Sequence, residues 1–127
     1  MDQAKQMQEL VNDFANHLLK QQAIMVAGGD VTKGNRHHDV AFTALDDLVY
    51  RYSKTGLEAL AQLLHHEDPK VRCTTANVLL GDKHEESKAV LEDIASRPDL
   101  GLICAGAQAT LGRWENGTWT RPFEEEP

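Results

Sequence analysis

An internal repeat of 31 residues constrains this chain more than any other feature of its sequence. Residues 68–80 and 99–111 look like the same segment written twice. The matched positions include Asp68 and Asp99, Cys73 and Cys104, Ala76 and Ala107, and Leu80 and Leu111. A fixed period of this size is typical of stacked helical repeats, in which no unit buries its apolar face alone. The repeat therefore predicts stacked helices, whereas it indicates little about chemistry.

Helical periodicity extends over most of the chain. Apolar residues at a spacing near 3.6 predict helices up to about residue 24 and over residues 38–53, 57–66, 69–80, 85–96 and 100–114. A polar loop closed by Gly34 separates the first two helices, and Gly56 breaks the chain after the second. Helix 38–53 matches as a third, more degenerate copy of the repeat. We therefore expect three helix pairs, each with an outer and an inner helix.

The ends of the predicted helices carry recognisable signals. Asp68 is a good N-cap, and Pro69 suits the first helical position because its missing N–H has no role within the helix there. Gly81 is expected to end that helix at the C′ position. Residues 115–127 are expected to form an irregular tail whose Trp119 folds back, because terminal repeats otherwise expose apolar surface.

The segment Asp68-Pro69-Lys70-Val71-Arg72, between a leucine-rich helix and an alanine-containing helix, resembles the HEAT repeat. The short period is similar to that of the compact HEAT-like repeats in phycobilin-lyase-type proteins. Nearly the whole chain also resembles a small bacterial family carried as a domain of unknown function. The stretches that match it are residues 35–36, 68–72, 89–95 and 111–117. In the other copy Leu100 and Ile103 replace the proline and the arginine, so the motif is complete only once.

The resemblance implies an all-α fold of three antiparallel helix pairs, stacked as a short HEAT/armadillo-like right-handed solenoid with an irregular C-terminal cap. It implies structural roles for Asp68 and Arg72, in a structural motif with Pro69 and Val71. The physical chemistry agrees, because an aspartate favours the positive end of the helix dipole. An arginine one turn later can pair with it or with a neighbouring loop. The family has no established catalytic residues.

Size and charge limit the classes of function. A chain of 127 residues suits one domain, here residues 1–127, and buries roughly two-thirds of its unfolded surface without a metal or disulfide. The formal net charge is -7, from 20 acidic and 13 basic residues. That balance argues against nucleic acid as a partner, because phosphates require basic surface. It is compatible with a basic protein partner.

The inner helices carry the expected binding surface, which is the stripe opposite the core. Its candidate residues are Asp39, Thr43, Asp46, Lys70, Thr74, Asn77 and Gln108. Inner helices of solenoids line the concave face that binds ligands, so Asp46, Asn77 and Gln108 are expected to form a row across it. The alternatives are an ordinary polar helix surface and a contact surface on the 28–38 loop.

Metal, cofactor and catalytic sites lack support in the sequence. The adjacent pairs His37-His38 and His65-His66 point about 100° apart on a helix, and the i, i+4 spacing of helical zinc sites is absent. Residues 28–34 do not fit a phosphate-binding loop, and no nucleophile motif occurs. We therefore expect no metal, no cofactor and no enzymatic activity. Cys73 and Cys104 are expected to be small buried side chains rather than a disulfide or redox pair.

Three hypotheses of function remain. The leading one is a non-enzymatic protein-binding module, in one version an immunity protein or antitoxin that occludes a basic toxin. The second is an adaptor or assembly factor with transient protein clients. The third is a ligand-binding or lyase-like HEAT domain, although aromatic residues make up only 6% of the chain. The polar N-terminus leads into no apolar run of membrane-span length, so we expect a cytoplasmic monomer or weak dimer without membrane contact.

Overall fold

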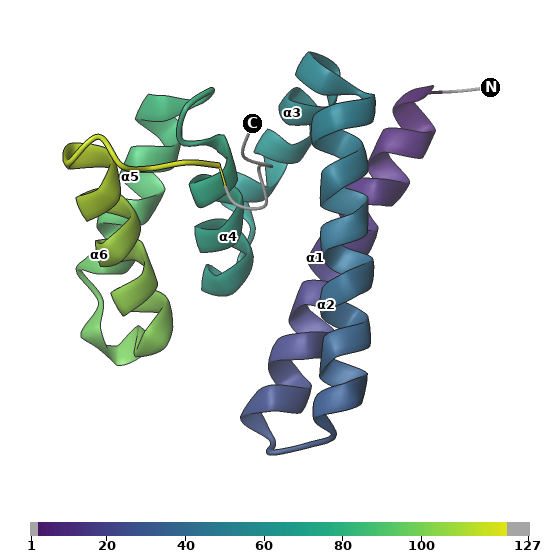
Figure 1. Ribbon diagram of the computed structural model, residues 1–127, viewed down its shortest axis with the longest axis horizontal. Helices are drawn as coiled ribbons and strands as arrows, with labels where there is room; N and C mark the ends of the chain where they lie inside the picture. Colours follow the sequence, from purple (N-terminus) through teal and green to yellow (C-terminus); the bar gives the residue numbers. More distant parts are fainter. Residues whose placement is uncertain (1–2, 122–127) are drawn as a thin grey trace. The chain divides into compact units, whose positions relative to one another are not determined.

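The computed structural model describes residues 3–121, apart from the side chains of Val26 and Val31 (Figure 1). Every regular element in this range is a helix, which confirms the all-α prediction. None of the described helices is long and apolar enough to span a bilayer. The elements are α1 (Gln3–Val26), α2 (Val31–Asp46), the π-helix η1 (Asp47–Arg51), α3 (Ser53–Leu60), the 3₁₀ helix η2 (Ala61–His65), α4 (Pro69–Leu79), α5 (His84–Ala95), the 3₁₀ helix η3 (Pro98–Leu100) and α6 (Leu102–Glu115).

The chain divides into two compact units, Met1–Leu60 and Ala61–Pro127. The first contains α1, α2, η1 and α3, and the second contains η2, α4, α5, η3 and α6. Each unit has its own buried apolar side chains, so each is described separately. Assignment of residues 1–127 to a single domain stays a prediction.

In the first unit, α1 and α2 lie side by side along much of their length (Figure 1). Phe14 is fully buried between them, with its ring edge-on to Phe42 at a centroid distance of 6.0 Å. Tyr52, the residue after η1, also contacts α1, because its hydroxyl donates a hydrogen bond to Gln6 Oε1 at 3.0 Å. The buried residues of the two helices recur at helical spacing: Val11, Phe14, Ala15 and Leu18 on α1, and Ala41, Ala44 and Leu45 on α2.

The α1–α2 connection is shorter than the sequence suggested. α2 begins at Val31, not at about residue 38, because Asp30 caps it with Oδ1 accepting a hydrogen bond from Thr32 N at 2.8 Å. The predicted polar loop up to Gly34 is therefore wrong, and most of the 28–38 segment is helix. Gly34 lies inside α2, where an added Cβ would be only 3.1 Å from Met25 Sδ. This glycine permits close helix packing rather than a turn.

Gly56 was expected to break the chain, and this prediction is wrong. It is buried inside α3, and an added Cβ would lie 1.8 Å from the carbonyl oxygen of Leu48 in η1. The glycine therefore allows α3 to pack against the π-helix. Ser53, the first residue of α3, has φ of 50°, a conformation that L-residues seldom adopt. This corner is thus formed by unusual backbone geometry at two neighbouring places.

In the second unit, α4 starts as predicted, with Asp68 as the N-cap and Pro69 in the first turn. The matching helix of the other repeat copy starts differently. Asp99, which aligns with Asp68, lies in the 3₁₀ helix η3, and α6 begins two residues after the predicted position. Gly101 precedes α6 with φ of 59°, so its backbone makes the corner and no side chain caps the helix. The sequence repeat therefore does not extend to this corner.

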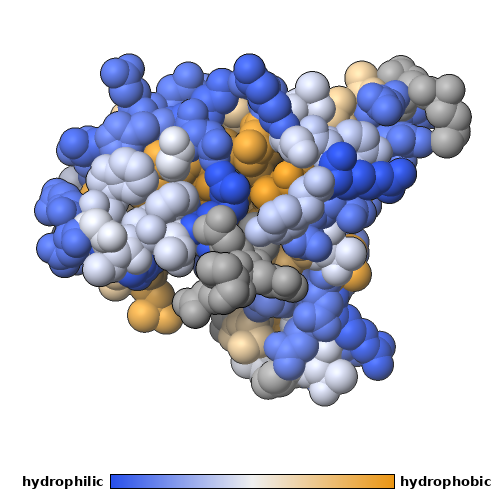
Figure 2. All heavy atoms as spheres, turned by 45° about the horizontal axis from the view of Figure 1, so that its top comes forward, coloured by the Kyte–Doolittle hydropathy of each residue, from blue (hydrophilic) through white to orange (hydrophobic). Residues whose placement is uncertain are grey.

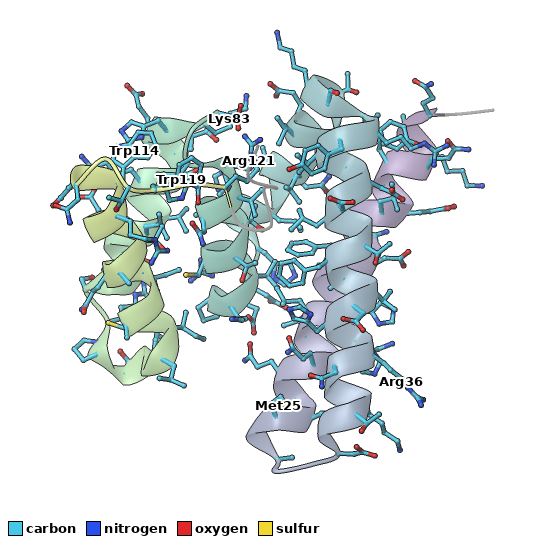
Figure 3. The ribbon with its side chains drawn as sticks, viewed as in Figure 1. Met25, Arg36, Lys83, Trp114, Trp119 and Arg121 are labelled. Carbon is cyan, nitrogen blue, oxygen red and sulfur yellow. The ribbon has the colours of Figure 1, made fainter. Side chains whose placement is uncertain are left out.

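The segment after α6 folds back onto α4 (Figure 3). Trp119 Nε1–H donates a hydrogen bond to Asn77 Oδ1 at 2.9 Å, in agreement with the expectation that Trp119 folds back. Its ring lies against Gly81, where an added Cβ would be 3.3 Å from the indole. Gly81 follows the C-cap Leu80 and so occupies the C′ position, as predicted. Its φ is not positive, and the glycine provides space for Trp119. Arg121 continues the contact with a hydrogen bond to Val78 O and an ion pair to Asp82.

Candidate functional site

The exposed side of α2 is one candidate surface, because it carries three of the residues that were expected to bind a partner. Asp39, Thr43 and Asp46 are all exposed. Their i, i+4, i+7 spacing places them together, on the side of α2 away from the buried Ala41 and Leu45. These three residues therefore share one exposed side of α2, whereas their role in binding stays a prediction.

Exposed apolar side chains accompany these polar residues. Val40 is 42% exposed and Tyr50 of η1 is 51% exposed. Figure 2 shows a largely hydrophilic surface with smaller hydrophobic areas between polar side chains. We define the α2 face as Asp39, Val40, Thr43, Asp46 and Tyr50.

The start of the α2 face has its own contacts. The Asp39 side chain is 80% exposed, and its Oδ1 lies 3.6 Å from Nδ1 of His38. The His38 ring stacks on Phe42 at a centroid distance of 4.4 Å. The carboxylate at the start of the face therefore lies beside an imidazole that packs on the helix.

The candidate residues of the second unit make contacts within the chain. Thr74 Oγ1 donates to the carbonyl of Lys70 at 2.8 Å, and Asn77 accepts the Trp119 indole N–H. Gln108 Nε2 donates to Ala95 O at 3.0 Å. Asn77 and Gln108 belong to this unit and Asp46 to the other, so the expected row of three remains a prediction.

The Asp68–Arg72 segment has the structural role that was expected of it. Asp68 Oδ1 accepts hydrogen bonds from Lys70 N at 2.8 Å and from Val71 N at 3.3 Å. Arg72 Nη1 donates to the carbonyls of His66 and Glu67 at 2.7 and 2.9 Å, and so it binds the neighbouring loop. These bonds satisfy the first N–H groups of α4 and two carbonyls of the loop that follows η2. We call residues 66–72 the η2–α4 corner.

An open groove of about 590 Å³ lies between the η2–α4 corner and α5. Its lining residues are Leu64, His65, His66, Glu67, Arg72, Ala89, Val90, Asp93 and Arg97. Asp93 and Arg97 form an i, i+4 ion pair at 3.2 Å on the rim. Two guanidinium groups thus face two carboxylates in the lining, so its formal charge is balanced. The sequence repeat did not indicate this groove, because it depends on how the corner packs against α5.

Both cysteines are free, and only one of the two is fully buried as expected. Cys104 is buried and its thiol donates to Ala95 O at 3.3 Å, whereas Cys73 is half-buried. Burial raises the pKa of the Cys73 thiol, and the nearby positive charge of Lys70 offsets part of this effect. A thiol with a raised pKa forms little thiolate at neutral pH, which makes it a poor nucleophile. Within residues 3–121, no group of three or more His, Cys, Asp or Glu side chains could hold a metal ion.

A histidine contact that sequence reasoning missed joins α1 to α2. Nδ1 of His17 lies 2.8 Å from Nδ1 of His37. The histidine pairs that are visible in the sequence, His37-His38 and His65-His66, are neighbours along the chain. The His17–His37 pair instead joins two helices. Its only advance signal would have been the pairing register of α1 and α2, which depends on where α2 begins.

No protein-family model, curated protein or solved structure matches this chain.

Proposed function

We propose that the chain is a non-enzymatic protein-binding module that recognises one partner protein through the α2 face. In this proposal its helix pairs stack as a short right-handed HEAT-like solenoid that presents the face. The observation that carries the proposal is the α2 face itself, where two carboxylates and the exposed side chains of Val40 and Tyr50 follow one another along α2 and η1.

The composition of the face supports binding to a protein. Tyrosine is enriched at the centres of protein interfaces, where an aromatic ring contributes much contact area. Charged groups favour the rim, where they guide orientation and association. The α2 face contains both kinds of group, because Tyr50 and Val40 supply apolar area and Asp39 and Asp46 supply charge. On the opposite side of α2, Ala41, Ala44 and Leu45 are buried, and their packing holds the helix in place.

The charge of the chain indicates the kind of partner. The formal net charge is -7, and the α2 face contributes two carboxylates that no described lysine or arginine pairs with in an ion pair. Complementary charge speeds the encounter with a basic protein. An immunity protein or antitoxin that captures a basic toxin is the concrete version of the proposal, and it rests on charge and on analogy of fold.

A second candidate is an adaptor that holds segments of several client proteins. The groove beside the η2–α4 corner favours it, because its wall is fixed by Arg72 and its lining combines Leu64 and Val90 with charged groups. Such a groove suits a partner's loop or side chain. Modest affinity for several clients, rather than one tight complex, would distinguish this candidate.

The test compares two charge-reversal variants in co-purification from native lysate at moderate salt. One carries Asp39→Lys with Asp46→Lys on the α2 face. The matched control carries Glu9→Lys with Glu92→Lys, which reverses the same charge at exposed positions elsewhere. Mass spectrometry should identify one dominant partner with the wild type and the control, and its association with the α2 variant should be slowed about tenfold or more at low salt. Equal loss with both variants would contradict a role for the α2 face.

A further inference from the structure

The His17–His37 contact has the geometry of a hydrogen bond between two rings that point at each other. The Nδ1 atoms are 2.8 Å apart and the ring centroids are 5.0 Å apart. The distance between the centroids is close to the Nδ1–Nδ1 distance plus the distance from each centroid to its own Nδ1 atom. The two Nδ1 atoms therefore lie nearly on the line that joins the ring centres. The rings are inclined by 29°. Two lone pairs that point along one line do not converge on a chelated metal ion, so a shared proton fits the contact better.

The number of protons decides whether this contact can form. With both rings neutral, one Nδ1–H donates to the other Nδ1. With one ring charged, the imidazolium still donates its Nδ1–H to the neutral ring, and the bond is strengthened by charge. With both rings charged, two N–H groups face each other at 2.8 Å and the bond is lost. The pair therefore titrates as a unit, and only its second protonation breaks it.

The groups around the pair oppose that second protonation. His37 is half-buried, and partial burial lowers its pKa, while the positive charges of His17 and Lys20 lower it further. The other charged or titratable groups within about one turn are Asp13 on α1 and Lys33, Arg36, His38 and Asp39 on α2. A histidine whose folded-state pKa is lowered contributes stability above its unfolded pKa of about 6.5, and that contribution is lost as the pH falls through the folded-state pKa.

The pair is adjacent to the α2 face. His37 is followed by His38, which stacks on Phe42, and then by Asp39 and Val40. Loss of the bond removes one contact between α1 and the turn of α2 that precedes Asp39. The second proton also adds a positive charge two residues before Asp39, which reduces the negative field of the face.

We propose that the His17–His37 pair is a proton-controlled link between α1 and α2, so that the α2 face binds its partner near neutral pH and releases it on acidification. The inference rests on the proposed function, because it assigns regulation to the same face. The partner that this inference requires is a basic protein, because a positive charge added near the α2 face repels a basic surface.

The link is tested first without a partner. Histidine side-chain NMR of the wild type should show two coupled titration steps for His17 and His37, with the second below the ordinary histidine range. Urea unfolding should show the folded-to-unfolded ratio falling about tenfold for each unit by which the second step is lowered, once the pH is below that step. His37→Asn should remove this loss, and the control His84→Asn, which changes a histidine of the other unit that lies outside the groove, should keep it. Independent titration of the two rings near pH 6.5 would overturn the link.

The regulation is tested by binding of the co-purified partner at pH 7, 6 and 5. Wild type and His84→Asn should lose binding at the lowest pH, and the binding of His37→Asn should change less between pH 7 and pH 5. Binding independent of pH, with the NMR result intact, would overturn the regulation and leave the proposed function standing. Failure to find a partner at any pH would overturn the proposed function together with the regulation, while the titration would still decide whether the link exists.

Discussion

The two helix corners at η1–α3 and η2–α4 are built in different ways. At η2–α4, side chains hold the chain, because Asp68 caps α4 and Arg72 binds two carbonyls of the loop between the two helices. At η1–α3, backbone proximity does so, because Gly56 lets α3 approach the Leu48 carbonyl and Ser53 accepts a positive φ. A corner held by side chains leaves a motif in the sequence. A corner held by backbone proximity leaves a glycine whose role depends on what lies opposite.

The largest effect is expected from filling the space at Gly56. In Gly56→Ala the new methyl group would lie 1.8 Å from Leu48 O, so α3 must shift away from η1. We expect the free energy of unfolding to fall by about 3 kcal/mol, measured by urea unfolding followed by circular dichroism.

The control for this variant is Gly106→Ala in α6, where no heavy atom lies within 4 Å of the added Cβ. There alanine should raise the free energy of unfolding by about 0.5–1 kcal/mol, through its better helix propensity. A loss below about 0.5 kcal/mol in Gly56→Ala would show that the corner is not held by close backbone approach.

The next effect is expected from the cap of the other corner. Asp68→Ala removes the acceptor for Lys70 N and Val71 N and should lower the free energy of unfolding by about 1–2 kcal/mol. Asp99→Ala is the matched control, since Asp99 occupies the aligned repeat position but lies exposed in η3. It should change stability by less than about 0.5 kcal/mol. Equal losses in thermal or urea unfolding would mean that both repeat copies use the same cap.

The smallest effect is expected at Ser53. With φ of 50°, this serine carries a backbone strain that glycine lacks, so Ser53→Gly should raise the free energy of unfolding by about 0.5 kcal/mol. The control Ser96→Gly changes a serine with φ of -89° that caps α5, and it should lower stability instead. A destabilised Ser53→Gly variant would refute the strain at this corner.

The sequence supported those predictions that depend on local chemistry. The cap formed by Asp68 and Pro69 and the unpaired state of the cysteines follow from residue type and spacing. The start of α2 was missed because Gly34 resembles a loop residue, although Asp30 two residues before Thr32 was an available cap signal. Glycine within a helix gains its meaning from the neighbouring helix, which the sequence alone does not supply.

In the candidate site, too, features that depend on local spacing could be predicted from the sequence, and features that depend on packing could not. Exposure of Asp39, Thr43 and Asp46 on one side of α2 follows from helical spacing, so it could be predicted. The contribution of Tyr50 could not, because it lies in η1, where the helix changes from α to π geometry. The His17–His37 pair depends on the register between α1 and α2, and the groove depends on packing of α5 against the η2–α4 corner.

The central claim, that the α2 face binds a partner protein, is tested most directly by the dissociation constant of the purified complex. Tyr50→Ala removes an apolar side chain that is 51% exposed on the face, and Leu102→Ala removes one that is 90% exposed on α6. Tyr50→Ala should weaken binding of the partner about tenfold or more, and Leu102→Ala should leave the dissociation constant unchanged. Unchanged binding by Tyr50→Ala, or an equal loss in both variants, would contradict the central claim.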